Sequence, residues 1–318
     1  MAGDSKNAAV DMATLGCALA IDRTWGEPPD HWHPVVWMGR LVTLMEHCRP
    51  RQSPVREWLW GAATVTVVVG SAAAGGWAVE QAAGRLPLAL AVPMRGLVLK
   101  TLFAGRALEQ AAGRVAQALA QDDIAQARAA LGWLVSRERS DLTREEVAGA
   151  VIESVAENTS DSLTAPLLAY GLFGLPGAAA YRAVNTLDAM LGYHGEYEYA
   201  GKAAAHLDDV LNLLPARFTA LLLCLASPAR GQAARIARRD HGLTESPNAG
   251  WPMAAIAGAL GVCLPKAGAY RLHGEAPQPN AAQVFAAITL MQRATIGTAA
   301  LSLLCLAGRA LRGVSHAA

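Results

Sequence analysis

The sequence predicts an all-α fold, a polytopic helical membrane protein with a polar helical cytoplasmic domain. The 318-residue chain is 53% hydrophobic and only 17% charged, whereas soluble proteins carry roughly 25% charged residues. Its mean hydropathy is +0.24. Three runs have no charged residue: Trp58 to Val79 has 22 residues, and Ser162 to Tyr181 and Ser246 to Pro265 have 20 each. About 20 such residues cross a bilayer. The competing interpretation is a large soluble α-protein that buries these runs.

Apolar segments alternate with polar ones along the chain. Residues 8–21 are weakly apolar, and the polar stretch 22–57 leads into 58–79, the best spanning candidate, with Trp58, Trp60 and Trp77 as interfacial anchors. A second run, 86–104, is interrupted by Pro93 and Arg95. Further apolar segments lie near 162–181, 211–229, 246–265 and 280–308, the last of which contains Arg293. We therefore expect one membrane-embedded domain over 1–318, with 105–161 as a polar helical cytoplasmic insertion.

The basic residues predict the orientation of the chain. Arginines gather in 40–56 and in 230–239, which places both stretches on the cytoplasmic side. If 162–181 and 211–229 both spanned, the polar stretch 182–210 would face outwards, although it is dense with polar groups of catalytic type. Prolines and glycines interrupt the first run: Pro166, Gly171, Gly174, Pro176 and Gly177. We therefore expect 162–181 to be a broken or re-entrant element that leaves 182–210 at the cytoplasmic face.

Several functional classes are disfavoured by the sequence. A formal net charge of +1 argues against a nucleic-acid partner. The five cysteines are widely separated, which predicts neither a zinc site nor a disulfide framework. The stretch Gly195 to Lys202 resembles a phosphate-binding loop, but it has one residue too many, and Ala203 replaces the Ser or Thr that would hold magnesium. We interpret that similarity as chance.

Carboxylates at helical spacing form the first candidate site. Glu146, Glu153, Glu157 and Asp161 fall on one face of a helix. Two such carboxylates with a substrate phosphate would suit Mg²⁺, although a solvated acidic face is the plain alternative. Asn158 and Thr159 favour a site, because they lead directly into an apolar run where polar groups are costly.

Three further polar clusters border apolar segments. Arg182, Asn185 and Asp188 share a helical face. The next cluster runs from His206 through Asp208, Asp209 and Asn212 to Arg217. The last runs from Arg238 through Arg239 and Asp240 to Ser246, Asn248 and Gly250. There the arginines, the amides of a helix N-terminus and a close backbone approach at glycine predict a phosphate site, the alternative being an ordinary cap and a positive-inside anchor.

These residues match a known family in order, from residue 22 to about 262. The matching strings are Asp22-Arg23, Gly26-Glu-Pro-Pro29, His33-Pro34-Val35, Trp37-Met-Gly39-Arg40, Ser136-Arg137 through Asp141, Ile152-Glu-Ser-Val-Ala-Glu-Asn-Thr159 with Asp161, Val184-Asn-Thr-Leu-Asp-Ala-Met190 with Gly192-Tyr193, Leu207-Asp-Asp-Val-Leu-Asn212 with Pro215-Ala-Arg217, and Ser246-Pro-Asn-Ala-Gly250. The chain resembles the CobD/CbiB family of adenosylcobinamide-phosphate synthases. It departs from the family pattern at Glu27, where aspartate is usual, and at Ser140-Asp141.

The resemblance implies an enzyme of the inner membrane that makes an amide bond in cobalamin biosynthesis. A corrinoid carboxylate is coupled to (R)-1-amino-2-propanol O-phosphate or a related amino alcohol phosphate, with ATP as co-substrate and Mg²⁺ as cofactor. Membrane lipid and other late-pathway membrane enzymes are the expected partners besides the substrates. The alternative function is a non-catalytic membrane transporter or an AmpE-like sensor.

Roles for the candidate residues follow as hypotheses. The metal candidates are Glu153, Glu157 and Asp161. The catalytic candidates are Glu153, Glu157, Asp188, Asp208 and Asp209. The candidates for binding substrate or phosphate are Arg137, Arg182, Asn185, Arg217, Arg239, Ser246 and Asn248.

Overall fold

The chain forms two structural units, each assembled from segments that are distant in sequence. The computed structural model describes residues 2–51, 53–135, 138–192, 195–266 and 268–315. Unit 1 comprises Met1–Ala104, Ala165–Leu211 and Ala299–Ala318, and unit 2 comprises Gly105–Thr164 and Asn212–Thr298. Nearly all described elements are helices, which confirms the predicted all-α class. That 1–318 is one membrane-embedded domain with an insertion at 105–161 stays a prediction.

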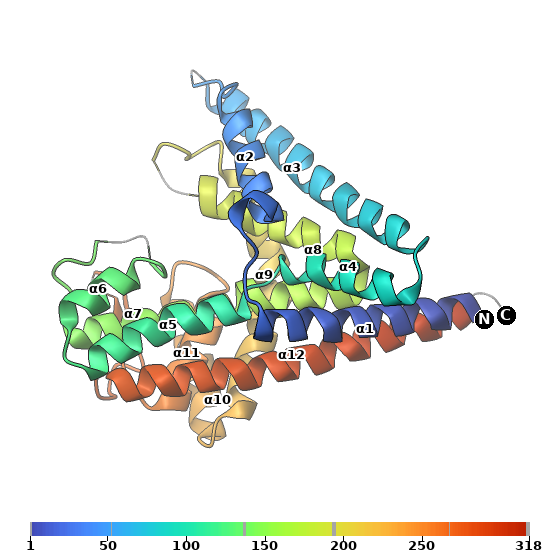
Figure 1. Ribbon diagram of the computed structural model, residues 1–318. Helices are drawn as coiled ribbons and strands as arrows, with labels where there is room; N and C mark the ends of the chain where they lie inside the picture. Colours follow the sequence, from blue (N-terminus) through green and yellow to red (C-terminus); the bar gives the residue numbers. More distant parts are fainter. Residues whose placement is uncertain (1, 52, 136–137, 193–194, 267, 316–318) are drawn as a thin grey trace. The chain divides into compact units, whose positions relative to one another are not determined.

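Unit 1 is built around two helix pairs. Its elements are α1 (Ala2–Thr24), the 3₁₀ turn η1 (Asp30–Trp32), α2 (Pro34–Glu46), α3 (Pro54–Ala83), α4 (Leu88–Lys100), α8 (Ala165–Leu191), the first residues of α9 (Lys202–Ala226) and the last part of α12 (Ala281–Ser315). α1 packs along α4, and α3 packs against α8 (Figure 1). Small residues bring the second pair close together: a Cβ at Gly76 would lie 2.8 Å from the carbonyl carbon of Leu175.

Unit 2 contains shorter helices and a small hairpin. Its elements are α5 (Gly105–Ala120), α6 (Ile124–Leu131), α7 (Arg144–Thr159), the π-helical turn η2 (Ser160–Thr164), α10 (Arg230–Asp240), the 3₁₀ turn η3 (His241–Leu243), α11 (Gly250–Leu260), β1 (Leu264–Lys266) and β2 (Tyr270–Leu272), with the remaining parts of α9 and α12. α5 contacts α6 and α7, and α10 packs against α11 (Figure 1). β1 and β2 pair antiparallel, with Lys266 opposite Tyr270.

Long apolar helices make this a multi-pass membrane protein. Within the described ranges, four helical stretches are long and apolar enough to span: Pro54–Ala83, Arg144–Leu191, Lys202–Ala226 and Ala281–Leu311. α3 is the most exposed of them, with only 17% of its hydrophobic window buried. Some polar side chains on these segments form hydrogen bonds with backbone carbonyls. Arg293, for example, donates a hydrogen bond of 3.1 Å to the carbonyl of Ala226, the last residue of α9.

Two details of the predicted segments are wrong. The run 246–265 does not form a spanning helix, because α11 covers only Gly250–Leu260 and stops where Gly261 adopts a left-handed backbone with φ 66°. Trp60 is buried and donates its indole N–H to the carbonyl of Met45, so it is not an exposed anchor like Trp58 and Trp77. The stretch 182–210 is largely helical, in agreement with the helical face predicted for Arg182, Asn185 and Asp188, because α8 continues to Leu191 and α9 begins at Lys202.

The predicted break in 162–181 is confirmed at Gly174. This residue interrupts α8 with φ 72° and ψ −162°, a conformation that a glycine adopts without strain. The break frees the backbone N–H of Leu175, which donates to the Glu80 carboxylate at 2.8 Å. Glu80 also contacts Arg95, which forms an ion pair with Asp11 as well. The charge that interrupts the apolar run of α4 is therefore neutralised inside unit 1.

Candidate functional site

Unit 2 contains a polar cavity of about 480 Å³. Its walls come from α7, from the turn that precedes α11, and from the β hairpin. The polar residues that line it are Glu153, Ser154, Glu157, Asn158, Thr244, Glu245, Ser246, Lys266 and Tyr270. Residues from the Ile152–Thr159 string and from the Ser246–Gly250 string therefore meet at one cavity, although about ninety positions separate them in the sequence.

The α7 wall presents two carboxylates one helical turn apart. Glu153 is only 7% exposed, and Glu157 lies four residues further along the helix. Hydrogen bonds within this wall fix its shape. Ser154 donates to the carbonyl of Leu134 at 3.2 Å, and Asn158 donates to the carbonyl of Ser154 at 3.0 Å. The side chains at this wall are thus held by their own helix and by the loop beside it.

The helix changes its winding directly after this wall. A π-helical turn covers Ser160–Thr164, where Ser162 donates to the Asn158 amide oxygen at 3.0 Å. Such turns shift the register of side chains and recur at functional sites. Asp161 lies in the turn and is not among the residues that line the cavity. Glu146 instead forms a capping box with Thr143 at the start of α7.

The opposite wall is a tight turn built around Ser246. Its hydroxyl oxygen accepts hydrogen bonds of 3.2 Å from the backbone N–H groups of Asn248 and Ala249. Gly250 is required for a reason that differs from the predicted one: a Cβ there would overlap the carbonyl oxygen of His241 and the Thr244 hydroxyl. The glycine therefore permits a close backbone approach within the fold, and the amides expected to bind an anion are already engaged by Ser246.

Arg217 braces this turn from α9. Its guanidinium donates to the Asn248 amide oxygen at 2.7 Å and to the carbonyl of Pro247 at 3.3 Å, and it lies 5.3 Å from the centre of the Trp251 ring. Trp251 stacks in turn on His241, with ring centres 3.9 Å apart. The structure therefore joins two predicted clusters, with Arg217 and Asn248 supporting the wall behind the lining residues.

Arg239 is directed to carboxylates rather than to the cavity. It contacts Asp240 at 2.6 Å and Glu275 at 3.2 Å. Burial raises the pKa of Asp240, but hydrogen bonds from Arg239 and from the backbone N–H of His273 outweigh it, and the net pKa lies below the ordinary value. The two carboxylates hold the pKa of Arg239 well above its usual value. The structure does not bring Arg239 to the cavity, and its role in binding phosphate stays a prediction.

Five polar lining residues were given no role from the sequence: Ser154, Thr244, Glu245, Lys266 and Tyr270. Lys266 and Tyr270 are paired in the hairpin, and the Lys266 ammonium lies 5.7 Å from the Tyr270 ring centre. Tyr270 also contacts Met253 through its hydroxyl at 3.9 Å. The only available signal was the lysine that ends the uncharged run 246–265, because strands of three residues leave no detectable alternation.

The carboxylates of this cavity suit a magnesium ion that takes part of its ligands from a substrate. In the described part of the chain, no group of three or more His, Cys, Asp or Glu side chains is arranged to hold a metal. The predicted trio of Glu153, Glu157 and Asp161 therefore does not form a complete cage. Mg²⁺ in nucleotide sites uses one or two carboxylates and takes its other ligands from substrate phosphates and water. Glu153 and Glu157 fit that mode of binding.

The remaining candidates lie in unit 1 or outside the described residues. Arg182 donates to the Asn185 amide oxygen at 3.1 Å, as their spacing on a helical face predicted. The carboxylates of Asp188 and Asp209 interact electrostatically, so the strings around them meet within this unit. Asp208 precedes Asp209 on α9. Arg137 lies outside the described residues.

An ion network around a buried lysine in unit 1 also involves family strings to which no role had been assigned. The Lys100 side chain is 0% exposed, and its ammonium lies 3.1 Å from Asp22 and 2.6 Å from Glu27. Glu27 also lies 3.1 Å from His33. Burial raises the pKa of Glu27, but His33 and Lys100 outweigh it and lower the net pKa. Glutamate at position 27 therefore has a defined structural role.

Comparison with known proteins agrees with the resemblance found in the sequence. A family model described as CobD/Cbib protein matches residues 15–297. The cobalamin biosynthesis protein CobD of Chromobacterium violaceum is 42% identical over 320 aligned positions, which cover 95% of this chain and 98% of the relative. CobD of Dehalococcoides mccartyi is 42% identical over 261 positions, covering 80% and 84%. CbiB of Salmonella arizonae is 42% identical over 255 positions, covering 78% and 80%. No solved structure matches the chain.

The helices and the cavity define the class of the protein: a multi-pass α-helical membrane protein with a carboxylate-rich cavity. The match covers most of the chain and includes both strings that line the cavity. The chain belongs to the CobD/CbiB family.

Proposed function

We propose that this chain acts in cobalamin biosynthesis by joining an amino alcohol phosphate, such as (R)-1-amino-2-propanol O-phosphate, to the carboxylate of adenosylcobyric acid in an ATP-dependent reaction. One observation carries the proposal: two separate family strings supply Glu153, Glu157 and Ser246 to the same cavity. Membership of a family whose relatives are named cobalamin biosynthesis proteins supports the pathway.

The reaction requires the corrinoid carboxylate to be activated. A carboxylate is a poor electrophile, and phosphoryl or adenylyl transfer from ATP to one carboxylate oxygen gives it a good leaving group. The amine then attacks the acyl carbon, the C–N bond forms, and phosphate or AMP departs with that oxygen. The amine must first lose a proton, which a nearby carboxylate such as Glu245 can accept.

Charge in the cavity suits phosphorylated substrates. Magnesium, when bound, would neutralise phosphate oxygens, and Glu153 and Glu157 are the residues that would hold it. Lys266 lies on the hairpin wall, and its ammonium would contact a substrate phosphate directly. Arg217 and Asn248 keep the facing turn in place. Each wall of the cavity thus has an assigned role.

The location of the reaction follows from its co-substrate. ATP is available inside the cell, so the cavity would open to the cytoplasm from the inner membrane. Placement of 182–210 at the same face stays a prediction. Cysteine introduced at Gly195, in the turn between α8 and α9, should react with an impermeant reagent only after cells are lysed.

The direct test uses membranes that contain the protein, with cobyric acid, ATP, Mg²⁺ and labelled aminopropanol phosphate. We expect label to enter a corrinoid amide, with ATP consumed only when both other substrates are present. Membranes that contain the intact protein but form no labelled corrinoid would reject the ligase proposal. ATP-independent uptake of a corrinoid by sealed vesicles would instead support the transporter alternative.

A further inference from the structure

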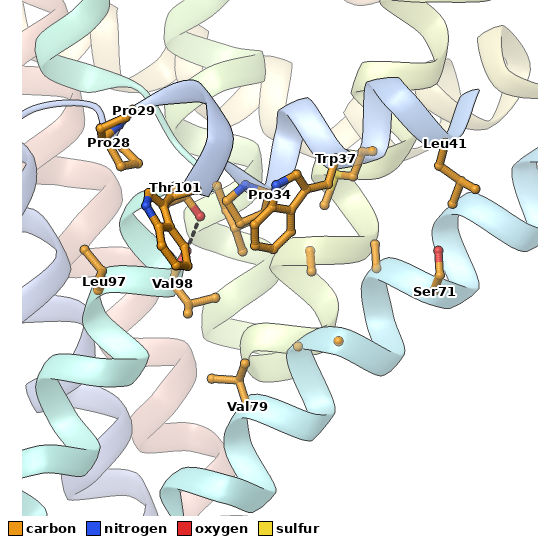
Figure 2. Close-up of a pocket in the computed structure, with 17 residues that line it drawn as sticks. Pro28, Pro29, Pro34, Trp37, Leu41, Ser71, Val79, Leu97, Val98 and Thr101 are labelled. Carbon is orange, nitrogen blue, oxygen red and sulfur yellow. Dashed lines mark hydrogen bonds between the residues drawn. The ribbon is translucent and has the colours of Figure 1, made fainter. Parts of the chain in front are cut away.

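Unit 1 contains a second cavity, of about 630 Å³, whose character is opposite to that of the polar one. It lies between α2, α3 and α4, with Ala179 of α8 and the loop after α1 completing the wall. Figure 2 shows Trp37 and Leu41 from α2, Val79 from α3 and Val98 from α4 around the common space. A cavity of this size is in the range that holds small ligands.

The cavity exists because α3 carries small residues at this level. Its face toward the space is formed by Ser71, Ala72, Gly75, Gly76 and Val79, which recur at helical spacing. Gly76 is used for close packing against α8, whereas a Cβ at Gly75 would meet no atom within 4 Å. The cavity therefore arises because these α3 residues have small side chains or none. The larger residues of α2 and α4 form its other walls.

The lining offers almost no hydrogen bonds to a ligand. None of the described lining residues is charged. The Ser71 hydroxyl donates to the carbonyl of Val68 at 2.9 Å, and the Thr101 hydroxyl donates to that of Val98 at 2.7 Å, the bond drawn dashed in Figure 2. The Trp37 indole N–H donates to the carbonyl of His31 at 3.0 Å. Only an apolar group matches such a lining, and water does not fill apolar cavities readily.

The surroundings identify the apolar group. α3 forms one wall and is a candidate membrane span with most of its hydrophobic surface outside the protein. Leu97 and Trp37 on the other walls are nearly half exposed, so the cavity is open rather than sealed. Trp32 and Trp37 are of the kind that gathers at membrane interfaces. The apolar groups that surround a membrane-spanning helix such as α3 are the acyl chains of the bilayer lipids.

We propose that this cavity binds one acyl chain of a bilayer phospholipid, which lies against the Ser71–Val79 face of α3 and beneath Trp37. The bound chain would fill the hollow between α3 and α4 and hold the two helices at a fixed separation. This site is distinct from the polar cavity of unit 2, and it does not depend on the ligase proposal.

A pair of glycines in the same helix provides the test. Gly75→Leu fills the cavity, whereas Gly70→Leu is the matched control, because a Cβ at Gly70 also meets no atom within 4 Å and Gly70 does not line the cavity. Each full-length variant is extracted from membranes, washed in mild detergent and analysed by native mass spectrometry. We expect wild type and Gly70→Leu to retain a phospholipid, and Gly75→Leu to retain several-fold less. Equal retention in all three, or no phospholipid on the wild type, overturns the proposal.

A spectroscopic measurement distinguishes the cavity from loosely bound lipid. In nanodiscs of phospholipids with brominated acyl chains, the fluorescence of Trp37, isolated by subtracting a Trp37→Phe variant, should be quenched in wild type and in Gly70→Leu. Gly75→Leu should reduce that quenching, and Ala72→Leu, on the same wall, serves if Gly75→Leu does not accumulate. Unchanged quenching in the cavity-filling variant, or an unquenched Trp37 in the wild type, contradicts acyl-chain binding and leaves a protein helix as the occupant to be sought.

Discussion

Two lysines, one in each unit, show how the same side chain serves different ends. Lys100 in unit 1 is fully buried and lies between the carboxylates of Asp22 and Glu27. Lys266 in unit 2 is exposed on a hairpin and lines a cavity that also contains Glu153, Glu157 and Glu245. Its ammonium lies 5.7 Å from the centre of the Tyr270 ring.

The difference teaches how to separate structural charge from functional charge in this family. Around Lys100, the partners are supplied by the fold, and the ammonium itself is closed to solvent although the Glu27 side chain is 30% exposed. Around Lys266, carboxylates outnumber ammonium groups among the described lining residues, and the space is open to a ligand. Closed networks should govern stability, and open ones should govern activity. The following predictions test that division, starting with the largest effect.

Removing the Lys100 charge should cause the largest loss of stability. Lys100→Met leaves the buried Asp22 and the partly exposed Glu27 without their cation, and removing one partner of a buried pair costs about 3–5 kcal/mol. Denaturant unfolding in detergent should show this loss. The double variant Lys100→Met with Glu27→Gln should recover part of it, because one unpaired, partly desolvated charge is removed as well. If Lys100→Met were as stable as wild type, the Lys100 network would not govern stability.

The cavity carboxylates should show the reverse behaviour. Glu153→Gln and Glu157→Gln should each lower the ligation rate by about 10²–10³-fold, the effect typical of losing one group that stabilises transition-state charge. Their unfolding transitions should stay close to that of wild type, because each amide keeps the volume of the acid. Labelled-substrate turnover and denaturant unfolding are measured on the same preparations.

Glu146→Gln is the matched control for these two variants. Glu146 lies on the same helix but forms the capping box with Thr143, away from the cavity. It should retain wild-type turnover, since glutamine also serves in a capping box. Equal loss of activity in all three variants would mean that α7, rather than its carboxylates, had been damaged.

The sequence predicted the helical class, the spanning segments and one wall of the cavity. A long run without charged residues predicted α3. Polar residues directly before another such run predicted a site at Glu153, Glu157 and Asn158. Both signals work because burying charge in hydrocarbon is costly, so such residues are placed with a purpose. Prolines and glycines likewise revealed the break at Gly174, where the backbone adopts a positive φ.

The features that the sequence did not predict depend on tertiary contacts. The hairpin that presents Lys266 has strands of three residues, too short for an alternating pattern. The engagement of Arg239 by Glu275 joins residues that are far apart in sequence, and no local pattern encodes it. Gly250 was assigned the right property, close backbone approach, but the approaching group is His241. The apolar cavity was not predicted, because small residues on one helix show a cavity only when the neighbouring helices are known.

Lys266 gives a third and smaller prediction. Lys266→Gln should raise KM for the amino alcohol phosphate about tenfold, or ~1.4 kcal/mol, and leave kcat nearly unchanged, as expected when uniform binding is lost. Lys266→Arg should restore part of the affinity, because it keeps the charge. Arg271→Gln is the control, since this basic residue of the same hairpin does not line the cavity. A normal KM in Lys266→Gln would leave the ligase proposal intact but remove Lys266 from the site.

The smallest effect is expected at Asp240, where the charge belongs to a partly exposed pair. The pKa of this carboxyl group is lowered in the folded chain by Arg239 and by the N–H of His273, which outweigh its burial. A carboxyl group with a lowered pKa stabilises the fold above its unfolded pKa, about 3.9, and that stabilisation is lost as the pH falls through the folded pKa. Because Arg239 is 44% exposed, solvent screens the pair and its contribution to stability should be small.

Asp240→Asn should therefore be slightly less stable than wild type at neutral pH and should lose less stability on acidification below about pH 4, so that the two curves converge. Denaturant midpoints measured between neutral and acidic pH provide the test, with Glu275→Gln as a companion that removes the more exposed partner of Arg239 and should have less effect. Turnover near neutral pH should stay unchanged in both variants, because neither residue lines the cavity. Parallel pH curves for wild type and Asp240→Asn would show that the Asp240–Arg239 pair contributes nothing, and burial rather than pairing would then distinguish Lys100 from the exposed charges of unit 2.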